Sequence, residues 1–162
     1  MSFIRKNVVT GKVYAPGWFL AHEECTRVTK QIAQSGAVDV EGGKLVPMGT
    51  VYPSNDGNAI GIVYEDVDVT TGDMPGSVVT KGEVYEDRLP VTSVSYDAVT
   101  PESGDNPSEE GWYERSGSAG SYVYTLTTDT TVDSEKTYYE KVVTRISSAA
   151  KSALQALGFK FV

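Results

Sequence analysis

Ala59-Ile60-Gly61-Ile62-Val63-Tyr64 forms an almost unbroken apolar run in the first half of the chain. Its Ile and Val content, its length and the polar loop before it (Pro53 to Asn58) predict a buried β-strand. Gly61 lies inside the run, and a glycine within a strand indicates a bulge or a second backbone packed closely on that face. The run therefore favours a fold that is mainly β.

Shorter strands are predicted on both sides of this run. Val38–Val40 and Lys44–Val46 are separated by a turn that contains two glycines, which predicts a β-hairpin. Ser77–Thr80 and Glu83–Tyr85 flank Lys81-Gly82, and this pattern fits a second hairpin.

One helix is predicted close to the C-terminus, over Ser147–Leu157. Ser147 or Ser148 can cap its first turn, and Gly158 can end it. The spacing of Ala150, Leu154 and Leu157 gives it one apolar face. A helix of about three turns does not persist alone in water, so we expect it to pack on a sheet, with Phe159 and Phe161 leading into a final strand.

A second, weaker helix is predicted over Leu20–Gln34. Its Leu20, Glu24, Val28 and Ile32 would share one face, although Thr and Gln are poor or moderate helix formers in such a segment.

Residues 91–142 differ from the rest of the chain in charge and composition. They contain ten acidic and three basic residues, a net charge of −7, whereas the whole chain carries −8. They also hold six of the ten tyrosines and one of the two tryptophans, but one Leu and no Ile. This change predicts a separately organised insertion, which divides the chain into a domain of 1–90 with 143–162 and an inserted acidic, Tyr-rich β lobe at 91–142.

The inserted segment has strand patterns of its own. Ser121–Thr127 alternates strictly, and Trp112–Glu114 and Lys136–Val142 are rich in residues that favour strands. Two interpretations of Trp112, Tyr113 and Tyr124 remain open. They form an outward surface that binds a host surface or a carbohydrate, or they form the small core of the lobe because aliphatic residues are scarce there.

Composition excludes several classes of function. The net charge of −8 and the sequence pI of about 4.6 argue against direct binding to nucleic acid, which requires clustered Lys and Arg. No apolar run is long enough for a membrane span, and the N-terminus lacks the apolar core of a secretory signal, so we expect a cytosolic protein unless it leaves on a particle.

Catalytic and metal chemistry have few candidate residues. His22 and Cys25 are the single His and the single Cys, so neither an internal disulfide nor a Cys/His zinc site can form. Their spacing would place them on one face of a helix as a possible catalytic dyad, but a buried Cys beside a surface His is the simpler interpretation. We therefore predict no enzymatic activity, no catalytic residue, no metal and no cofactor.

Four segments, in order, resemble the head decoration proteins of lambda-like phages. They are an early hairpin over 38–51, the loop and strand DGNAIGIV at 56–63, the strand and corner KGEVYEDRLP at 81–90, and the closing ISSAAKSAL at 146–154 with FKFV at 159–162. Within the insertion, 106–114, 125–130 and 136–139 look like a small module that recurs in phage tail and head accessory proteins. The resemblance implies a β-sandwich or barrel-like decoration fold with one short C-terminal helix.

The resemblance also implies a function. Such proteins bind the outside of the expanded capsid as trimers at three-fold sites and stabilise the head, so the expected partners are the major capsid protein and two further copies of the chain. The expected location is the outer capsid surface of a virion assembled in the host cytoplasm. The alternative is a receptor- or carbohydrate-binding adhesin module of a head fibre or tail, for which the insertion would bind a host-surface ligand.

Two N-terminal clusters are candidate capsid contacts. Phe3, Ile4, Val8 and Val9 could add a short strand to an edge of the capsid protein, or could belong to a strand of the domain's own sheet. Trp18 and Phe19 could anchor an interface or belong to the core.

Overall fold

A computed structural model describes residues 14–162 and shows a mainly β protein, which confirms the predicted fold class. The chain forms two compact units: residues up to Val91 together with Arg145–Val162, and Thr92–Thr144. We call the first unit the base and the second the lobe. The composition predicts boundaries at 90/91 and 142/143, one and two residues earlier along the chain.

The central sheet of the base has four antiparallel strands in the order β1-β7-β5-β4. Its strands are β1 (Thr26–Ile32), β7 (Met74–Lys81), β5 (Gly61–Val63) and β4 (Val51–Tyr52). The predicted strand is β5, between β4 and β7, with Ile62 opposite Val79. A Cβ atom on Gly61 would lie 2.4 Å from the Val79 carbonyl oxygen, so the expected close approach of a second backbone is present.

The central strands are buried on both faces, because a separate apolar core lies on each side of the sheet. Ile62 and Val79 point into one core, whereas their neighbours Val63 and Val78 point into the other. Alternate residues of a strand face opposite sides, so burial on both sides requires an unbroken apolar sequence. The apolar run at 59–64 is explained in this way.

A second, three-stranded antiparallel sheet contributes to the core around Val63. It has the order β2-β3-β6, with β2 (Val38–Val40), β3 (Gly43–Val46) and β6 (Val67–Asp68). β2 and β3 form the predicted hairpin, with Val38 opposite Leu45. A short 3₁₀ turn, η1 (Gln34–Gly36), connects β1 to this hairpin.

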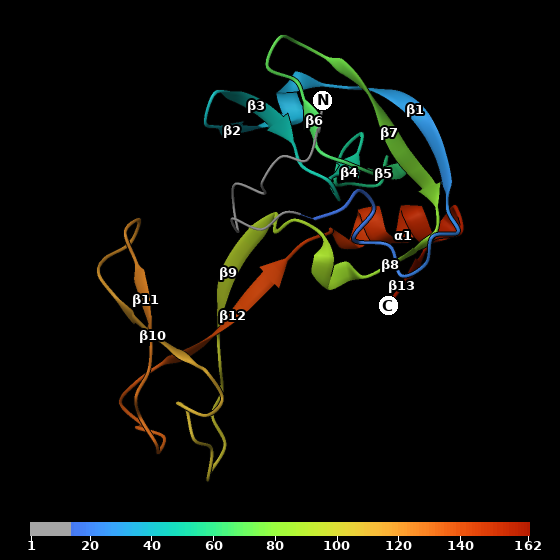
Figure 1. Cartoon of the computed structure of the whole chain (residues 1–162). Coiled ribbons are helices and arrows are strands. Elements are labelled where there is room, and N and C mark those ends of the chain that lie inside the picture. Colours follow the sequence, from blue (N-terminus) through green and yellow to red (C-terminus); the bar gives the residue numbers. More distant parts are fainter. Residues whose placement is uncertain (1–13) are drawn as a thin grey trace. The chain divides into compact units, whose positions relative to one another are not determined.

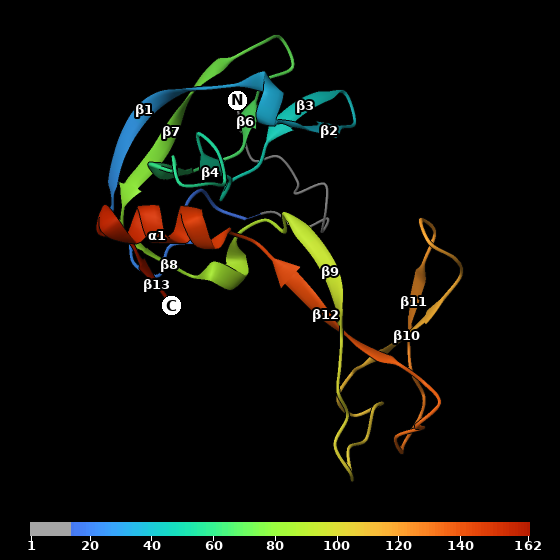
Figure 2. The ribbon, with the colours of Figure 1, turned by 180° about the vertical axis from the view of Figure 1, so that it is seen from behind.

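The C-terminal helix α1 (Ser148–Ala156) covers the core around Ile62 (Figures 1 and 2). The Ser147 hydroxyl accepts a hydrogen bond of 3.0 Å from the Ala150 amide, and Gly158 ends the helix with a positive φ of 98°. Ala150 and Leu154 are fully buried, as predicted, whereas Leu157 is 49% exposed and lies outside the apolar face.

The chain ends in β13 (Lys160–Phe161), which pairs in parallel with β8 (Glu83–Val84). This pairing corrects the second predicted hairpin, since β8 joins the C-terminal strand and not β7. A 3₁₀ turn, η2 (Glu86–Arg88), follows β8 and leads to the buried Leu89.

The helix predicted over Leu20–Gln34 is also wrong, because most of this segment is the edge strand β1. Seven consecutive residues, Thr26–Ile32, pair with β7. Thr26, Val28, Thr29 and Ile32 are β-branched and suit a pleated strand. The non-local pairing with β7 therefore overrides a helical spacing that was never strong.

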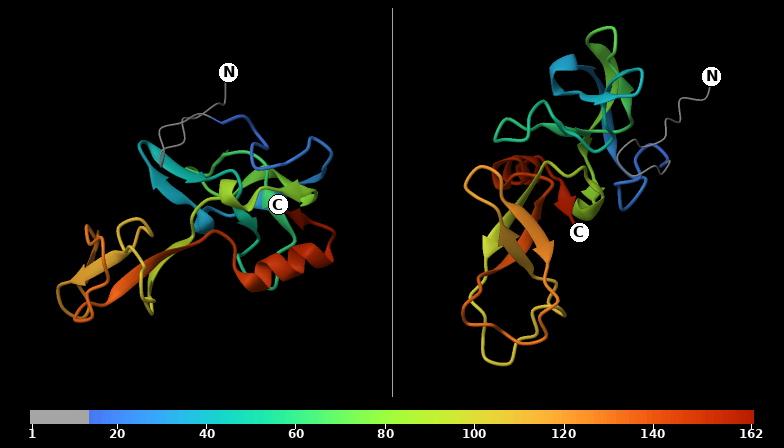
Figure 3. Two further views of the ribbon diagram at one scale, coloured as in Figure 1. Left: turned by 90° about the horizontal axis from the view of Figure 1, so that it is seen from below. Right: turned by 90° about the vertical axis from the view of Figure 1, so that its left-hand side faces the viewer.

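The lobe is one antiparallel sheet in the order β11-β10-β12-β9. Its strands are β9 (Ser93–Ala98), β10 (Tyr113–Ser116), β11 (Val123–Leu126) and β12 (Tyr138–Thr144). The sheet is curled (Figure 3). The rings of Tyr96 on β9 and Tyr124 on β11 accordingly stack at 4.0 Å, although two strands lie between them. Both ends of the lobe meet, with the Thr92 amide 2.8 Å from the Thr144 carbonyl oxygen.

Candidate binding sites

Aromatic and arginine side chains gather on one surface of the base. The Tyr14 and Trp18 rings stack with their centroids 4.1 Å apart, and the Arg88 guanidinium lies 4.7 Å from the Trp18 ring and 4.0 Å from the Tyr85 ring. Arg88 also donates a hydrogen bond of 3.0 Å to the Trp18 carbonyl. We call these four residues the tryptophan patch. All four side chains are half-buried, so part of each ring remains accessible.

A pocket of about 430 Å³ adjoins Trp18. Arg27 and Tyr64 line it with a cation–π contact of 4.1 Å, and Gly17 donates its amide to the Tyr64 carbonyl at 2.8 Å. The pocket therefore combines aromatic side chains with the charge of Arg27. Its remaining lining residues are Pro16, Leu20, Ala21, His22, Glu23 and Cys25.

The residues predicted as capsid contacts divide into three groups. Phe3, Ile4, Val8 and Val9 lie outside the described residues. Phe19 is fully buried in the core around Ile62, so the interpretation as a core residue holds and this side chain is not available for an interface. Trp18 is half-buried and belongs to the tryptophan patch.

His22 and Cys25 both line the pocket beside Trp18, but they do not lie on a helix. They precede β1, where the chain bends and then becomes extended. The His22 ring lies 3.9 Å from a Glu83 carboxylate oxygen, and Cys25 is a half-buried free thiol. In the described part of the chain, no three His, Cys, Asp or Glu side chains form a cluster that could hold a metal ion.

Four tyrosines form a cluster on one face of the lobe. Tyr113 is opposite Tyr139 in the register of β10 and β12, so their side chains share a face. Tyr96 stacks on Tyr124 and contacts the Tyr113 ring edge-on at 5.1 Å, and Tyr124 contacts Tyr139 edge-on at 5.3 Å. The rings thus pack mainly on each other and replace the aliphatic core that this segment lacks.

The opposite face of the lobe carries a second small core and a polar network. Trp112 is only 8% exposed and packs on the fully buried Tyr138, with the ring centroids 5.7 Å apart. This burial corrects the placement of Trp112 on an outward surface. The Tyr138 hydroxyl donates to Asp129 at 2.7 Å, and the Lys136 amine donates to Asp129 at 2.8 Å and to Glu114 at 3.2 Å.

These contacts shift three pKa values. Hydrogen bonds from Lys136 and Tyr138 hold the pKa of Asp129 below its ordinary value of 3.8. The same pairing with Asp129, and that with Glu114, raises the pKa of Lys136 above 10.5. Burial raises the pKa of the Tyr138 phenol above 10.0. Asp129 and Lys136 are therefore both charged, and Tyr138 neutral, across the whole neutral range.

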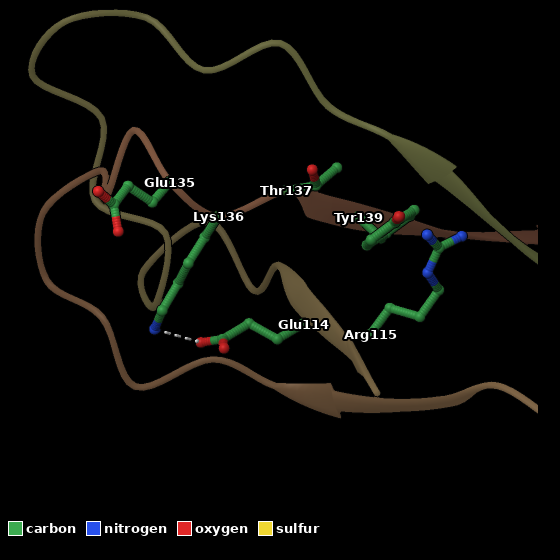
Figure 4. Close-up of a pocket in the computed structure, with 6 residues that line it drawn as sticks. All are labelled: Glu114, Arg115, Glu135, Lys136, Thr137 and Tyr139. Carbon is green, nitrogen blue, oxygen red and sulfur yellow. Dashed lines mark hydrogen bonds and ion pairs between the residues drawn. The ribbon is translucent and has the colours of Figure 1, made fainter. Parts of the chain in front are cut away.

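An open cleft of about 270 Å³ lies where β10 and β12 meet in the lobe (Figure 4). The Lys136 amine and the Glu114 carboxylate point toward each other across it, and the Arg115 guanidinium lies beside the Tyr139 ring, 5.0 Å from its centroid. Glu135 and Thr137 complete the lining. We call this feature the lobe cleft.

Tyr113 and Tyr124 are half-buried in the tyrosine cluster and do not line the lobe cleft. The sequence did not indicate Arg115, which lines the cleft and lies 4.2 Å from the Tyr122 ring as well as beside the clustered Tyr139. The strict alternation of Ser121–Thr127 was the available signal, since it placed Tyr122 and Tyr124 on one face of a strand.

No family model matches the chain, and no curated protein or solved structure matches it either. Among residues 14–162, no helix is long and apolar enough to cross a membrane.

Proposed function

We propose that this protein is a non-enzymatic structural subunit of a phage head, which binds the outside of the expanded capsid as a trimer and stabilises it. The base carries this function, and the major capsid protein is its partner. The proposal rests on the four segments that resemble lambda-like decoration proteins.

One structural observation supports the proposal more than any other. All four segments supply buried side chains to the same apolar core, although they are far apart in the sequence, and the early hairpin contributes Val51. The loop and strand at 56–63 contribute Ala59 and Ile62, and the segment at 81–90 contributes Val84 and Leu89. The closing segment contributes Ile146, Ala150, Leu154 and Phe159. Side chains that share one core must fit one another. The joint occurrence of these motifs therefore supports the resemblance to decoration proteins more strongly than any one short motif does.

The tryptophan patch is the proposed contact with the capsid or with a second copy in the trimer. Trp, Tyr and Arg are the residue types that most often dominate the binding energy of protein interfaces. The patch contains all three, and the pocket next to Trp18 offers space for a side chain of the partner. Three such contacts on one trimer act together, so each can be modest.

Co-sedimentation of the purified protein with expanded heads of the matching phage tests the function. We expect the folded protein to bind expanded heads and to raise their resistance to heat, because it stabilises the state that it binds. A folded protein that does not bind these heads would overturn the proposal.

Two variants then test the surface. Trp18→Ala should reduce head binding at least about tenfold, as expected for an interface hot spot. Val38→Ala replaces a side chain that is 43% exposed on the separate β2–β3 hairpin and should leave binding unchanged. Equal binding by both variants would exclude the tryptophan patch while leaving the function itself in place.

A further inference from the structure

The lobe cleft differs in chemistry from an ordinary apolar ligand pocket. Five of its six lining side chains are charged or polar, and the sixth is a tyrosine. Small-molecule sites are usually lined mainly by apolar groups, so this cleft does not suit a hydrophobic ligand. Its volume of about 270 Å³ is close to the lower end of the common range for ligand sites and allows a single small ring to enter.

Three lining side chains have hydrogen-bonding groups that no other described residue uses. Within residues 14–162, the Arg115 guanidinium makes cation–π contacts but no hydrogen bond or ion pair. The Glu135 carboxylate and the Thr137 hydroxyl likewise have no partner in this part of the chain. The cleft therefore presents the five N–H donors of Arg115, an acceptor at Glu135 and a group that can do both at Thr137.

Arg115 is held in place although its donors are unused. Its guanidinium lies 4.2 Å from the Tyr122 ring and 5.0 Å from the Tyr139 ring. A planar guanidinium that stacks on aromatic rings retains its in-plane N–H groups for another partner. The Lys136–Glu114 ion pair, at 3.2 Å, holds two further lining side chains in contact with each other. The donors are thus partly preorganised, which lowers the entropy lost on binding.

The charges decide which polar ligand fits. The cleft is lined by two cations and two carboxylates, and the lobe as a whole carries ten acidic and three basic residues. A phosphate or sulfate requires donors only and is repelled by the lobe, whereas a metal cation requires acceptors only and is repelled by Arg115 and Lys136. A neutral polyhydroxylated ligand both donates and accepts hydrogen bonds, as the cleft does.

We propose that the lobe cleft binds a neutral saccharide. Arg115 donates to the ring hydroxyls, Glu135 accepts from them, and Thr137 does either. This function is separate from capsid binding and assigns the lobe a role on the outside of the particle.

The test uses the full-length protein, uniformly labelled with ¹⁵N, and three neutral probes: galactose, glucose and N-acetylglucosamine. We expect saturable amide shifts for at least one probe, centred on residues 114–116 and 135–139, with a Kd on the order of millimolar for so small a site. Sodium sulfate and sialic acid serve as the anionic comparison and should bind more weakly.

Three variants and a control make the test specific. Glu135→Ala and Thr137→Val remove groups that have no partner among residues 14–162, so neither should disturb the fold, and each should weaken binding about three- to tenfold. Arg115→Ala should abolish binding, and near-UV circular dichroism of the tyrosines checks that the lobe remains folded. Lys141→Ala removes an exposed cation of β12 that does not line the cleft and should have no effect.

The proposal is overturned if none of the three neutral sugars gives saturable shifts, if the shifts map elsewhere, or if the anions bind more tightly. It is also overturned if Glu135→Ala and Thr137→Val bind like the unchanged protein. Head binding by the same variants should remain unaltered, so failure at the cleft and failure of the decoration function give different results.

Discussion

Gly61 is the residue at which two strands of the base come closest. A Cβ atom at this position would meet the Val79 carbonyl oxygen at 2.4 Å and a Val78 methyl group at 2.5 Å. The carbonyl belongs to the backbone of β7 and cannot rotate away, so the two strands would have to separate.

We therefore predict that Gly61→Ala lowers the free energy of unfolding by about 1–3 kcal/mol through overpacking. Gly57→Ala is the matched control, because a Cβ atom there would have no neighbour within 4 Å and φ is not positive. This control should be neutral, or stabilising by up to about 1 kcal/mol through a less flexible unfolded chain. Urea unfolding of both variants measures the difference, and equal midpoints would contradict the packing argument.

The protonation of Asp129 makes the stability of the lobe depend on pH. Its pKa is lowered in the folded state by hydrogen bonds from Lys136 and Tyr138, so its contribution is present above the ordinary value of 3.8. The contribution is lost as the pH falls below 3.8 through the folded pKa. Lys136 has the opposite sign: its contribution is present below 10.5 and is lost as the pH rises above that value.

Asp129→Asn should accordingly lower the melting temperature of the lobe at neutral pH and flatten its decline between about pH 5 and pH 2. The fluorescence of Trp112, measured in a Trp18→Phe background, reports on the lobe because each unit contains one tryptophan. Asp97→Asn removes an exposed carboxylate of β9 and is the control. The same acid dependence in both variants would exclude the Asp129 network as its source.

At the scale of elements, α1 shows how a short helix depends on its cap and on its packing. Nine residues are too few for a stable isolated helix. The Ser147 hydroxyl satisfies one of the free amides of the first turn, and Ala150 and Leu154 bury the apolar face.

Ser147→Ala should destabilise the base by about 1 kcal/mol, since it leaves the Ala150 amide without its partner. Ser152→Ala changes an exposed serine in the middle of the same helix to a better helix former and should be neutral or slightly stabilising. Thermal unfolding followed by far-UV circular dichroism compares the two. If the Ser147 cap contributed nothing to stability, Ser147→Ala and Ser152→Ala would have the same melting temperature.

Local patterns in the sequence were sufficient for α1, for β5 and for the β2–β3 hairpin, because each is specified by residues close together in the chain. Non-local pairing explains the failures. The segment Leu20–Gln34 has helical spacing, but its strand β1 pairs with β7 some fifty residues later, and β8 joins the C-terminal strand. β9 was not predicted, although Val94 and Tyr96 alternate, because its partner β12 is equally distant.

The binding sites were less predictable for the same reason. Trp18 was indicated by its residue type, but its contact with Arg88 joins residues 70 positions apart. Arg115 on β10 contacts Tyr139 on the neighbouring strand β12, and no local sequence pattern indicates such a contact. Composition alone predicted that the lobe is separate, because the tyrosines replace the missing aliphatic residues throughout it.

At the scale of the whole molecule, the two units have independent interiors. All residues of the two apolar cores of the base lie outside Thr92–Thr144. The lobe in turn is held together by its tyrosine cluster, by Trp112 with Tyr138, and by the polar network.

A protein in which a short Gly-Ser linker replaces Thr92–Thr144 should therefore fold cooperatively. It should retain the head binding of the full chain and lose saccharide binding. Circular dichroism and co-sedimentation measure the two properties. Loss of head binding in a folded deletion variant would favour adhesion through the lobe over decoration through the base.

The hydrogen bond between the Thr92 amide and the Thr144 carbonyl has a consequence for how such proteins diversify. The chain leaves the base after Val91 and returns at Arg145, and the first residue pair of the lobe already holds these two points together. Bringing the two ends of residues 92–144 together costs conformational entropy, and the strand pairing within the lobe offsets this cost. Any module whose ends lie equally close could be exchanged at this junction without a change in the register of the base, so the position is suited to recombination and to display of foreign domains.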